Sequence, residues 1–482
     1  MSLSISDSEL YDVIVAGGGP SGSMAALAAA REGCRVLLVE QFGFLGGSLT
    51  AMGVGPMMTF HNNAGEQVIQ GYPQELIDRL VQKGGSPGHI DDIITYCSTV
   101  TPFDSEMLKI ELDDMLTEAG VEVLFHTVLL DAETDGDRLT SITIANKSGV
   151  TRLHAKVFID STGDADLARR SGVDFEHGRR QDGLTQPMTM NLKVGNVDRD
   201  RLIAYVKANL DDCEFDYGVE LGLQRLERAP RLSLKTFIKA LARARETGEI
   251  SFNREFILLF ETAEVGTFII NVSRIQGLDP TNAADLSRAE MIGRKQCLEI
   301  FNFLRKHGAG FENAIRVDSA SKVGVRESKR IVGDYTLTKE DLLSARQFDD
   351  SIALGGYPID IHSPDKNGTV TSFFKHGTTY SIPLRSLTTA KVKNLVVNGR
   401  CLSATHEAFA AIRTTPTMMA IGQGAGTLAA LMARTGRPAA AIDYAELRAL
   451  LEARGALIRP PENFYMFTED FRTSTDASTP GA

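Results

Sequence analysis

A glycine-rich motif near the N-terminus has the residue types and spacing that bind a phosphate group. It reads Gly17-Gly18-Gly19-Pro20-Ser21-Gly22 and precedes a run of small residues. In such a motif Gly17 permits a tight turn, Gly19 lets the backbone approach a pyrophosphate, and Gly22 lets a helix pack against the preceding strand. The N-terminus of that helix offers unpaired N–H groups to the phosphates. We therefore predict a dinucleotide site formed by Gly17, Gly19, Pro20, Ser21 and Gly22.

Glu40 follows this motif at the distance expected of a ribose-binding carboxylate. It ends a second apolar run, Val36 to Val39, close to the roughly 20-residue spacing at which an acid meets the ribose hydroxyls. An acid there favours a ribose without a phosphate. The motif, the two apolar runs and Glu40 together favour dinucleotide binding, and the alternative is an α/β turn without a ligand.

Asp360 and His362 could carry out acid–base chemistry. They alternate along an expected strand, YPIDIH, so their side chains share one face. A carboxylate beside an imidazole can tune the pKa of the imidazole toward neutral pH, which suits a general base. We predict His362 as this base, and the alternative is a histidine that only packs.

Two further charged positions are candidates for the same chemistry. His406, next to Glu407, could handle a proton or could be a neutral packing residue. Arg326 lies in the sequence VRESKR, where it could line the site or belong to an internal ion-pair network.

The expected elements place these residues in two regions. Strands at Asp12–Ala16 and Val36–Val39 flank a helix at Ser21–Arg31, and residues 122–160 form a small β-meander that ends in a second glycine turn. Residues 172–385 alternate apolar runs with helical stretches at 199–210, 233–247 and 285–307. We predict an α/β fold with a nucleotide-binding domain of residues 1–172 and 386–460. An α+β substrate domain of residues 173–385 is inserted into it, and a tail follows at 461–482.

Composition narrows the classes of function. The chain has 482 residues, 43% of them hydrophobic and 23% charged, with a net charge of −11 that disfavours nucleic acid and anionic membranes as partners. The longest apolar stretch, Met418–Met432, is too short and too interrupted to span a bilayer. The first ten residues lack the basic region of a signal peptide, so we predict a cytoplasmic protein.

The cysteines and histidines predict neither a metal site nor a redox dithiol. The five cysteines contain no CxxC pair, and the nine histidines contain no HExxH motif. We therefore predict no metal. A homo-oligomer is compatible with the sequence.

The motifs together resemble those of a known family. GGGPSG with Glu40, FGFLGGSLT and VFIDSTGDADLARRSG resemble FAD-dependent oxidoreductases of the glutathione-reductase-like fold. The stretches VGVRESKRIVGDYTLT, GGYPIDIH, YSIPLRSL and NLVVNGRCLSATHEAFAAIRTTPTMMAIGQGAG are similar to one group in that fold, described as FAD-dependent oxidoreductases. More distantly, the chain is similar to the fumarate reductase and tricarballylate dehydrogenase flavoproteins. The resemblance implies FAD as cofactor and a Rossmann-like FAD-binding domain.

The resemblance adds residues to the expected site. It implies cofactor contacts at Gly46, Gly47, Ser48, Val128, Thr162, Gly163, Asp164, Gly399, Arg400, Gly422, Gln423 and Gly424. Many relatives carry an acid where Arg400 stands. Gly422 is expected to open or interrupt a helix near the pyrimidine edge of the flavin, and close helix packing is its other expected role. Arg413 stands where the fumarate-reductase relatives carry a substrate-binding arginine, and the alternative is a structural arginine that caps the helix.

We predict an FAD-dependent dehydrogenase or oxidase from these observations. It would oxidise a small polar or anionic molecule, bound between the two domains, by hydride transfer to flavin N5. The alternatives are a flavin-dependent hydroxylase, a flavoprotein subunit that passes electrons to a partner, and FAD as a structural group in a non-redox enzyme.

Overall fold

The N-terminal motif lies in a Rossmann-like α/β domain, and the predicted fold class is confirmed. The computed structural model describes residues 10–366, 368–462 and 464, so the predicted tail lies almost entirely outside the described residues. The first sheet has the order β5-β2-β1-β8-β7-β6, with β21 paired to β8. Its strands are β1 (Leu10–Ala16), β2 (Val36–Val39), β5 (Glu122–Leu124), β6 (Val128–Asp135), β7 (Arg138–Asn146), β8 (Gly149–Asp160) and β21 (Leu395–Val397).

Strand β8 belongs to both the parallel sheet and the predicted meander. Its first half pairs antiparallel with β7, and its second half runs parallel to β1 and β21. In this register Asp160 lies beside Ala16 on one side and Val397 on the other. The carboxyl ends of three parallel strands therefore meet at one edge, where ligands of open α/β sheets bind.

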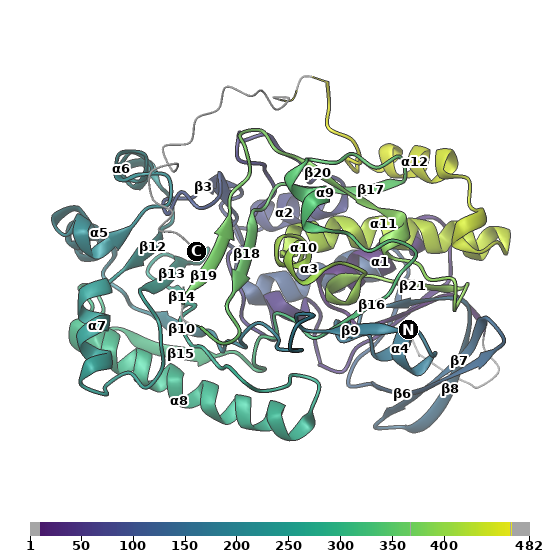
Figure 1. Cartoon of the computed structure of the whole chain (residues 1–482), viewed down its shortest axis with the longest axis horizontal. Coiled ribbons are helices and arrows are strands. Elements are labelled where there is room, and N and C mark those ends of the chain that lie inside the picture. Colours follow the sequence, from purple (N-terminus) through teal and green to yellow (C-terminus); the bar gives the residue numbers. More distant parts are fainter. Residues whose placement is uncertain (1–9, 367, 463, 465–482) are drawn as a thin grey trace.

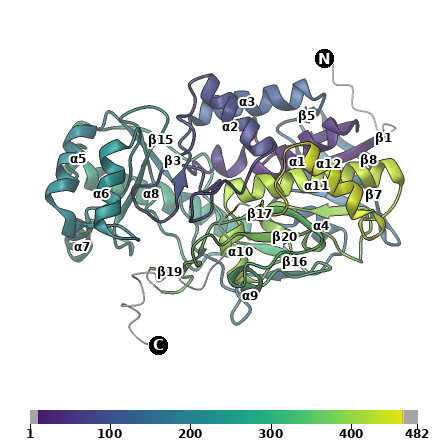
Figure 2. The ribbon, with the colours of Figure 1, turned by 90° about the horizontal axis from the view of Figure 1, so that it is seen from above.

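A second sheet forms the other part of the molecule (Figure 1). It is antiparallel, with the order β11-β12-β13-β14-β10-β15. Its strands are β10 (Leu192–Gly195), β11 (Cys213–Glu214), β12 (Ser233–Thr236), β13 (Ile257–Glu261), β14 (Phe268–Ile270) and β15 (Ile315–Ser319). Figure 2 shows α5, α6 and α7 gathered at this end of the molecule, away from α1, α11 and α12.

Four two-stranded sheets complete the strands of the described chain. They are β3 (Ile90–Asp91) with β4 (Thr99–Val100), β9 (Phe175–His177) with β16 (Lys329–Ile331), β17 (Ser351–Gly355) with β20 (Tyr380–Pro383), and β18 (Ile359–His362) with β19 (Thr369–Ser372).

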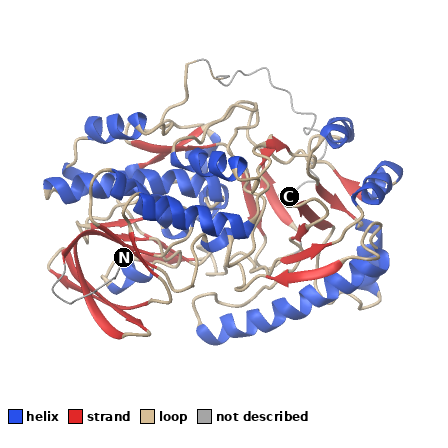
Figure 3. Cartoon of the chain, turned by 180° about the vertical axis from the view of Figure 1, so that it is seen from behind, coloured by secondary structure: helices blue, strands red, loops and turns tan. Residues whose placement is uncertain are grey.

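Helices cover both sheets, as the view from behind in Figure 3 shows. The α-helices are α1 (Pro20–Arg31), α2 (Tyr72–Gln82), α3 (Ser105–Glu118), α4 (Asp166–Arg170), α5 (Arg199–Ala208), α6 (Val219–Arg228), α7 (Ile238–Glu246), α8 (Ala283–His307), α9 (Lys339–Leu343), α10 (His406–Ile412), α11 (Thr415–Thr435) and α12 (Tyr444–Ala453). Short 3₁₀ turns are η1 (Gly47–Leu49), η2 (Leu210–Asp212), η3 (Leu384–Ser386), η4 (Gly399–Cys401) and η5 (Ala439–Ala441). None of the described helices is both long and apolar enough to cross a bilayer.

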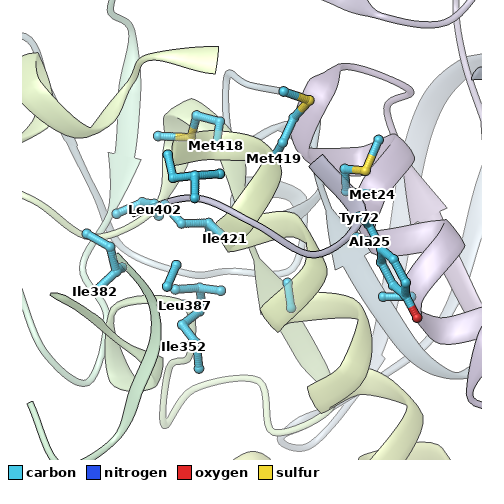
Figure 4. Packing of buried hydrophobic residues seen from close by; sticks show 14 of the residues in the cluster. Met24, Ala25, Tyr72, Ile352, Ile382, Leu387, Leu402, Met418, Met419 and Ile421 are labelled. Atoms are coloured by element: carbon cyan, nitrogen blue, oxygen red, sulfur yellow. The ribbon is translucent and has the colours of Figure 1, made fainter. Parts of the chain in front are cut away.

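Helix α11 is the central packing element of the first domain. Gly422 and Gly426 face α1 so closely that an added Cβ would overlap the carbonyl oxygens of Ser21 and Ala25. Farther along its surface, Met418 and Ile421 pack among side chains such as Ile382 and Leu387 (Figure 4). The small residues of α1 and α11 therefore allow backbone-to-backbone contact between the two helices.

Two predictions of secondary structure are wrong. The segment 233–247 was predicted as one helix, but Ser233–Thr236 is strand β12 and the helix begins only at Ile238. Phe237 between them has a φ of 59°, so the chain turns sharply there. Gly422 neither opens nor interrupts a helix, because α11 runs without a break from Thr415 to Thr435.

The buried apolar residues show how the chain divides. One cluster contains residues from Met188 to Val325 together with Ile93. Residues between Leu337 and Leu387 belong instead to the cluster that contains α1 and α11. Val173 and Ile331 belong to a third cluster, so the predicted substrate domain of residues 173–385 spans three clusters.

The contact between α1 and α11 makes a prediction about stability. Gly426→Ala should lower the free energy of unfolding by about 1–3 kcal/mol, since the new methyl group would overlap the carbonyl oxygen of Ala25. Gly195→Ala, at another buried glycine, is the control, because its Cβ would meet first the Cγ2 atom of the Val317 side chain at 3.2 Å, which can shift more easily than backbone. Thermal unfolding of both variants measures the difference. Equal melting temperatures for the two variants would contradict this account of the packing.

Candidate active site

A cavity of about 450 Å³ lies between the two sheets, where the ends of β1, β8 and β21 meet. Three loops that follow these strand ends form one wall. They are residues 17–22, residues 161–164 and the pair Gly399 and Arg400. The opposite wall includes Thr189, Asn191 and residues 324–326, which come from the part of the chain that contains the antiparallel sheet.

The space around Gly17, Gly19 and Gly22 fits the role that the motif predicts for each of them. Gly17 has a φ of +102°, and an added Cβ would lie 2.5 Å from the carbonyl oxygen of Ser161. A Cβ at Gly22 would overlap the carbonyl oxygen of Gly17. A Cβ at Gly19 would meet nothing within 4 Å, although Gly19 lines the cavity. The backbone at Gly19 is therefore open to a ligand.

The N-terminus of α1 fits a pyrophosphate. Pro20 occupies the first turn, and Ser21 lines the cavity. The Oγ atom of Ser21 is buried and has no hydrogen-bond partner among the described residues. An unpaired hydroxyl beside unpaired helix N–H groups is the donor set that a phosphate oxygen requires. These residues therefore fit the phosphates of FAD.

Glu40 lies at the cavity with its carboxylate held by the backbone. Its oxygens accept hydrogen bonds from the N–H of Gly18 at 2.7 Å and of Phe42 at 2.9 Å. Burial raises the pKa of Glu40, although both N–H donors act against this shift. Each carboxylate oxygen retains a lone pair, so the fixed carboxylate can still accept a ribose hydroxyl.

Arg400 forms an ion pair across the cavity wall. Its Nη2 lies 3.0 Å from Asp164 Oδ1, which also accepts a hydrogen bond from Ser328 Oγ at 2.6 Å. Burial raises the pKa of Asp164, but the charges of Arg400 and Lys322 outweigh burial and lower this pKa below its ordinary value. An acid is therefore present beside Arg400, on the loop after β8 rather than on the loop after β21.

Lys322 is a cation at this end of the cavity that sequence reasoning missed. It lines the cavity, and its Nζ lies 5.8 Å from the centre of the Phe42 ring. Its charge helps to lower the pKa of Asp164, and it acts against the rise that burial causes in the pKa of Glu40. No carboxylate of the described chain lies within ion-pair distance of it. Lys322 follows β15, so the chain after the second sheet's edge strand brings a cation near Glu40 and Asp164.

The other end of the cavity gathers charged residues from three segments. Asp360 and His362 on β18 share one face as predicted, with His362 Nε2 3.4 Å from Asp360 Oδ2. Arg413 Nη2 lies 3.7 Å from the same carboxylate, and the Tyr357 hydroxyl donates to it at 3.3 Å. Arg326 completes the group and donates hydrogen bonds to Pro187 O and Thr189 Oγ1.

The predicted tuning of His362 is wrong in direction. Burial, followed by the charge of Arg326, lowers the pKa of His362 to about 3, although Asp360 acts to raise it. Burial raises the pKa of Asp360, but His362, Arg413 and Arg326 together lower it far below its ordinary value. The pair therefore consists of a neutral imidazole and a charged carboxylate.

The structure places several predicted residues at the cavity and others behind it. Of the predicted cofactor and catalytic residues, the following line the cavity: Gly17, Gly19, Pro20, Ser21, Gly22, Glu40, Gly47, Ser48, Val128, Thr162, Gly163, Asp164, Arg326, His362, Gly399, Arg400 and Arg413. Gly46 lies behind the wall and donates its N–H to Gly18 O at 2.9 Å.

His406 takes part in a buried ion-pair cluster away from the cavity wall. Its Nδ1 lies 2.8 Å from Glu327 Oε1, and Glu327 also pairs with Arg330. Burial raises the pKa of Glu327, but the bond to His406 and the charge of Arg330 lower it below its ordinary value. The cluster pairs Glu327 and Arg330 of the VRESKR segment, whereas Arg326 of the same segment lines the cavity instead.

Gly422, Gln423 and Gly424 also face the protein rather than the cavity. Gly422 packs on Ser21, and Gly424 packs on Ile352. Gln423 Oε1 accepts the N–H of Tyr72 at 2.9 Å. The part of α11 that faces the cavity is its N-terminus, where Thr414 and Thr415 line the wall. The Thr-Thr-Pro sequence there is a helix-start signal that could have located it.

The open space at Gly19 predicts that a larger residue there prevents FAD binding without unfolding the protein. Gly19→Val should fold, because a Cβ at this position would meet no protein atom within 4 Å and the residue lines the cavity. It should prevent FAD binding, because it would fill the space beside the N-terminus of α1. Absorbance of the purified protein near 450 nm and its circular dichroism spectrum measure the two properties. A folded variant that retains FAD would contradict the assignment.

The position of Lys322 at the cavity predicts that its charge strengthens the binding of FAD. Lys322→Met keeps the length of the side chain and removes the charge, so the dissociation constant of FAD should rise about 5- to 50-fold, as expected for a phosphate-facing charge. The effect should shrink at high salt. Lys147→Met, at an exposed turn, is the control and should bind FAD as the wild type does. Equal affinity in both variants would remove Lys322 from the site.

One known protein shares part of the sequence. A thiamine thiazole synthase from Aeropyrum pernix is 32% identical over 173 residues, which cover 33% of this chain and 57% of that protein. The chain therefore spans just over half the length of this relative.

Similar solved structures share low sequence identity with the chain. They include a geranylgeranyl bacteriochlorophyll reductase-like protein from Thermoplasma acidophilum, at 12% identity and a TM-score of 0.43, covering 92% of this chain and 84% of that one. The anhydrotetracycline hydroxylase OxyS from Streptomyces rimosus has 13% identity and a TM-score of 0.42, covering 92% and 66%. The myxobacterial halogenase CndH has 14% identity and a TM-score of 0.47, covering 92% and 79%.

The whole catalytic core matches one family. The match to the FAD dependent oxidoreductase family extends over residues 12–451, which include both sheets and every wall of the cavity. The glycine motif, the unpaired Ser21 hydroxyl and the buried Glu40 carboxylate lie within it and fit the cofactor. The chain is therefore a member of the FAD-dependent oxidoreductase family.

Proposed function

We propose that this enzyme oxidises a small organic anion that is held by Arg413 and Arg326 beside the flavin. When bound, FAD supplies the two-electron acceptor, so the protein must bind the substrate, orient a C–H bond and accept one proton. The N-terminus of α11 and the two arginines lie at the same end of the cavity. This arrangement suits a substrate whose charged group is fixed a short distance from its reacting carbon.

The excess of positive charge is the observation that carries the proposal. Arg326 and Arg413 face the cavity, and Asp360 is the acid beside them. Burial, followed by repulsion from the charge of Arg413, lowers the pKa of Arg326 to about 9, so Arg326 still carries its charge at neutral pH. An anion between them would relieve this repulsion.

Unpaired donors at the same place support an oxygen-rich ligand. Arg413 Nε and Gln186 Nε2 are buried and have no hydrogen-bond acceptor among the described residues. The Gln186 amide is oriented by its Oε1, which accepts from Arg413 Nη2 at 3.4 Å and from the N–H of His362 at 3.2 Å. Because unpaired buried donors are costly, a carboxylate that accepts from them would gain affinity.

Asp360 and His362 have separate roles in this proposal. Asp360 stays ionised and holds Arg413, Tyr357 and His362 in one network. His362 is the group that accepts the proton, because its ring is neutral and lines the cavity. A bound anion offsets the charge of Arg326, which raises the affinity of His362 for that proton.

A flavin-dependent hydroxylase is the competing function. The hydroxylase and halogenase among the similar structures have names that agree with this alternative, but they share only a fold at 13–14% identity. The charge of the cavity supports the oxidation of an anion instead. The two functions differ in what reduces the bound FAD, since a hydroxylase needs a nicotinamide donor and oxygen.

The proposal predicts which compounds reduce the enzyme without oxygen. Under anaerobic conditions a hydroxy or amino acid from a metabolite panel should bleach the absorbance near 450 nm, while its amide or ester should not. Arg413→Met should lose about 2–5 kcal/mol of transition-state binding and keep its FAD. Arg434→Met, an exposed residue at the end of α11, is the control. Reduction by NADH or NADPH alone would favour the hydroxylase.

The low pKa of His362 predicts the shape of the pH profile. The ring must be neutral to accept a proton, and a pKa of about 3 keeps it neutral above about pH 4. The kcat/KM of the wild type should therefore show no acid limb from a histidine between about pH 5 and 8. His362→Gln should slow anaerobic reduction by roughly 10²- to 10⁴-fold. A limb near pH 6.5 that vanishes in His362→Gln would show that burial does not control this ring.

A further inference from the structure

Strand β15 forms an exposed edge of the antiparallel sheet. It is the last strand in the order β11-β12-β13-β14-β10-β15, and one of its sides pairs with β10. No other strand of the described chain pairs with its second side. Ile315 and Val317 on it are 57% and 50% exposed. An edge strand with exposed apolar residues is a template for pairing with another strand.

The charged residues of β15 have no partners within the described chain. Arg316 and Asp318 are both exposed, and although their backbones lie in the ladder with β10, neither side chain forms a hydrogen bond or ion pair with another described residue. Asp318 lies opposite Lys193 on β10, but the ammonium group of Lys193 bonds Ser105 Oγ at 3.0 Å instead. Opposite charges two residues apart on one edge strand are therefore both available to a partner.

The sequence of β15 is complementary to a second, antiparallel copy of the same strand. Two antiparallel copies of Ile315–Ser319 overlap fully only when Val317 of one lies opposite Val317 of the other. In that register each Arg316 faces Asp318 of the second copy, so one pairing creates two cross-strand ion pairs. Charges on an edge strand usually keep copies apart, whereas these charges attract in the fully overlapped register.

Apolar residues on the neighbouring helix extend this surface. Helix α8 packs beside β15, and its Met291, Ile292 and Leu298 are 53%, 39% and 46% exposed. In Figure 1 this long helix runs along the same border of the molecule as β15. A second copy that docks on the strand would bring additional apolar surface out of water.

We propose that two copies of this chain pair through β15, antiparallel and centred on Val317, so that the six-stranded sheet continues across a two-fold axis. The backbone groups of the free edge supply the hydrogen bonds, and Arg316 and Asp318 set the register. A two-fold axis perpendicular to the sheet requires an isologous contact, in which the same residues meet from both sides. The strand centred on Val317 satisfies this condition.

Charge reversal tests the register directly. Wild-type holoenzyme should sediment as a dimer in the micromolar range. Arg316→Asp places two acids opposite each other, and Asp318→Arg places two arginines opposite each other. Each change replaces two attractive pairs with two repulsive ones, so the dimer dissociation constant should rise about 10-fold or more. Arg437→Asp, in an exposed loop, and Asp135→Arg, at the exposed end of β6, make the same charge changes elsewhere and should leave the dimer intact.

Mixing the two variants separates this contact from unfolding. A chain with Arg316→Asp and a chain with Asp318→Arg are complementary, so an equimolar mixture should form a heterodimer with wild-type affinity. The double variant Arg316→Asp with Asp318→Arg should also recover the dimer. A monomeric wild type at about 100 µM, a dimer that survives both single reversals, or a mixture that does not reassociate would each overturn the proposal.

Discussion

The direct contact of α1 with α11 is the constraint on which the cavity depends. Gly422 and Gly426 press the backbone of α11 against Ser21 and Ala25, so the two helices hold a fixed relation. Helix α1 begins at the glycine motif, and α11 begins at Thr415 on the same cavity. One close contact therefore directs two positive helix ends into one cavity, where each favours a negatively charged group.

The groups around each buried acid at this cavity set the direction in which its pKa is shifted. Glu40 has mainly backbone donors, and burial raises its pKa. Asp164 and Asp360 are also buried, but Arg400 and the group around Arg413 lower their pKa values. The two acids that face arginines thus stay charged and hold cationic side chains in place. The excess cation that remains at Arg326 is what makes the far end of the cavity suited to an anion.

The sequence predicted the parts of the site that depend on local chemistry. The roles of Gly17, Gly19 and Gly22 follow from a short motif, and the alternation of Asp360 with His362 predicts their contact. The pKa of His362 could not be predicted, because it depends on burial and on Arg326 from a distant segment. Lys322 carries no motif, and only the packing of residues after β15 brings it to the cavity.

That same segment connects the two ends of the cavity with the sheet edge. After β15, Ala320 donates to Asn191 O at 3.0 Å, Lys322 donates to Ala51 O at 2.9 Å, and Gly324 exchanges hydrogen bonds with Thr189. These bonds hold the backbone between Lys322 and Arg326 against both parts of the molecule. Because five consecutive residues carry one cation toward the cofactor end and another toward the substrate end, a shift of this segment would move both charges together. Any contact that fixes β15 therefore also fixes where these two charges lie in the cavity.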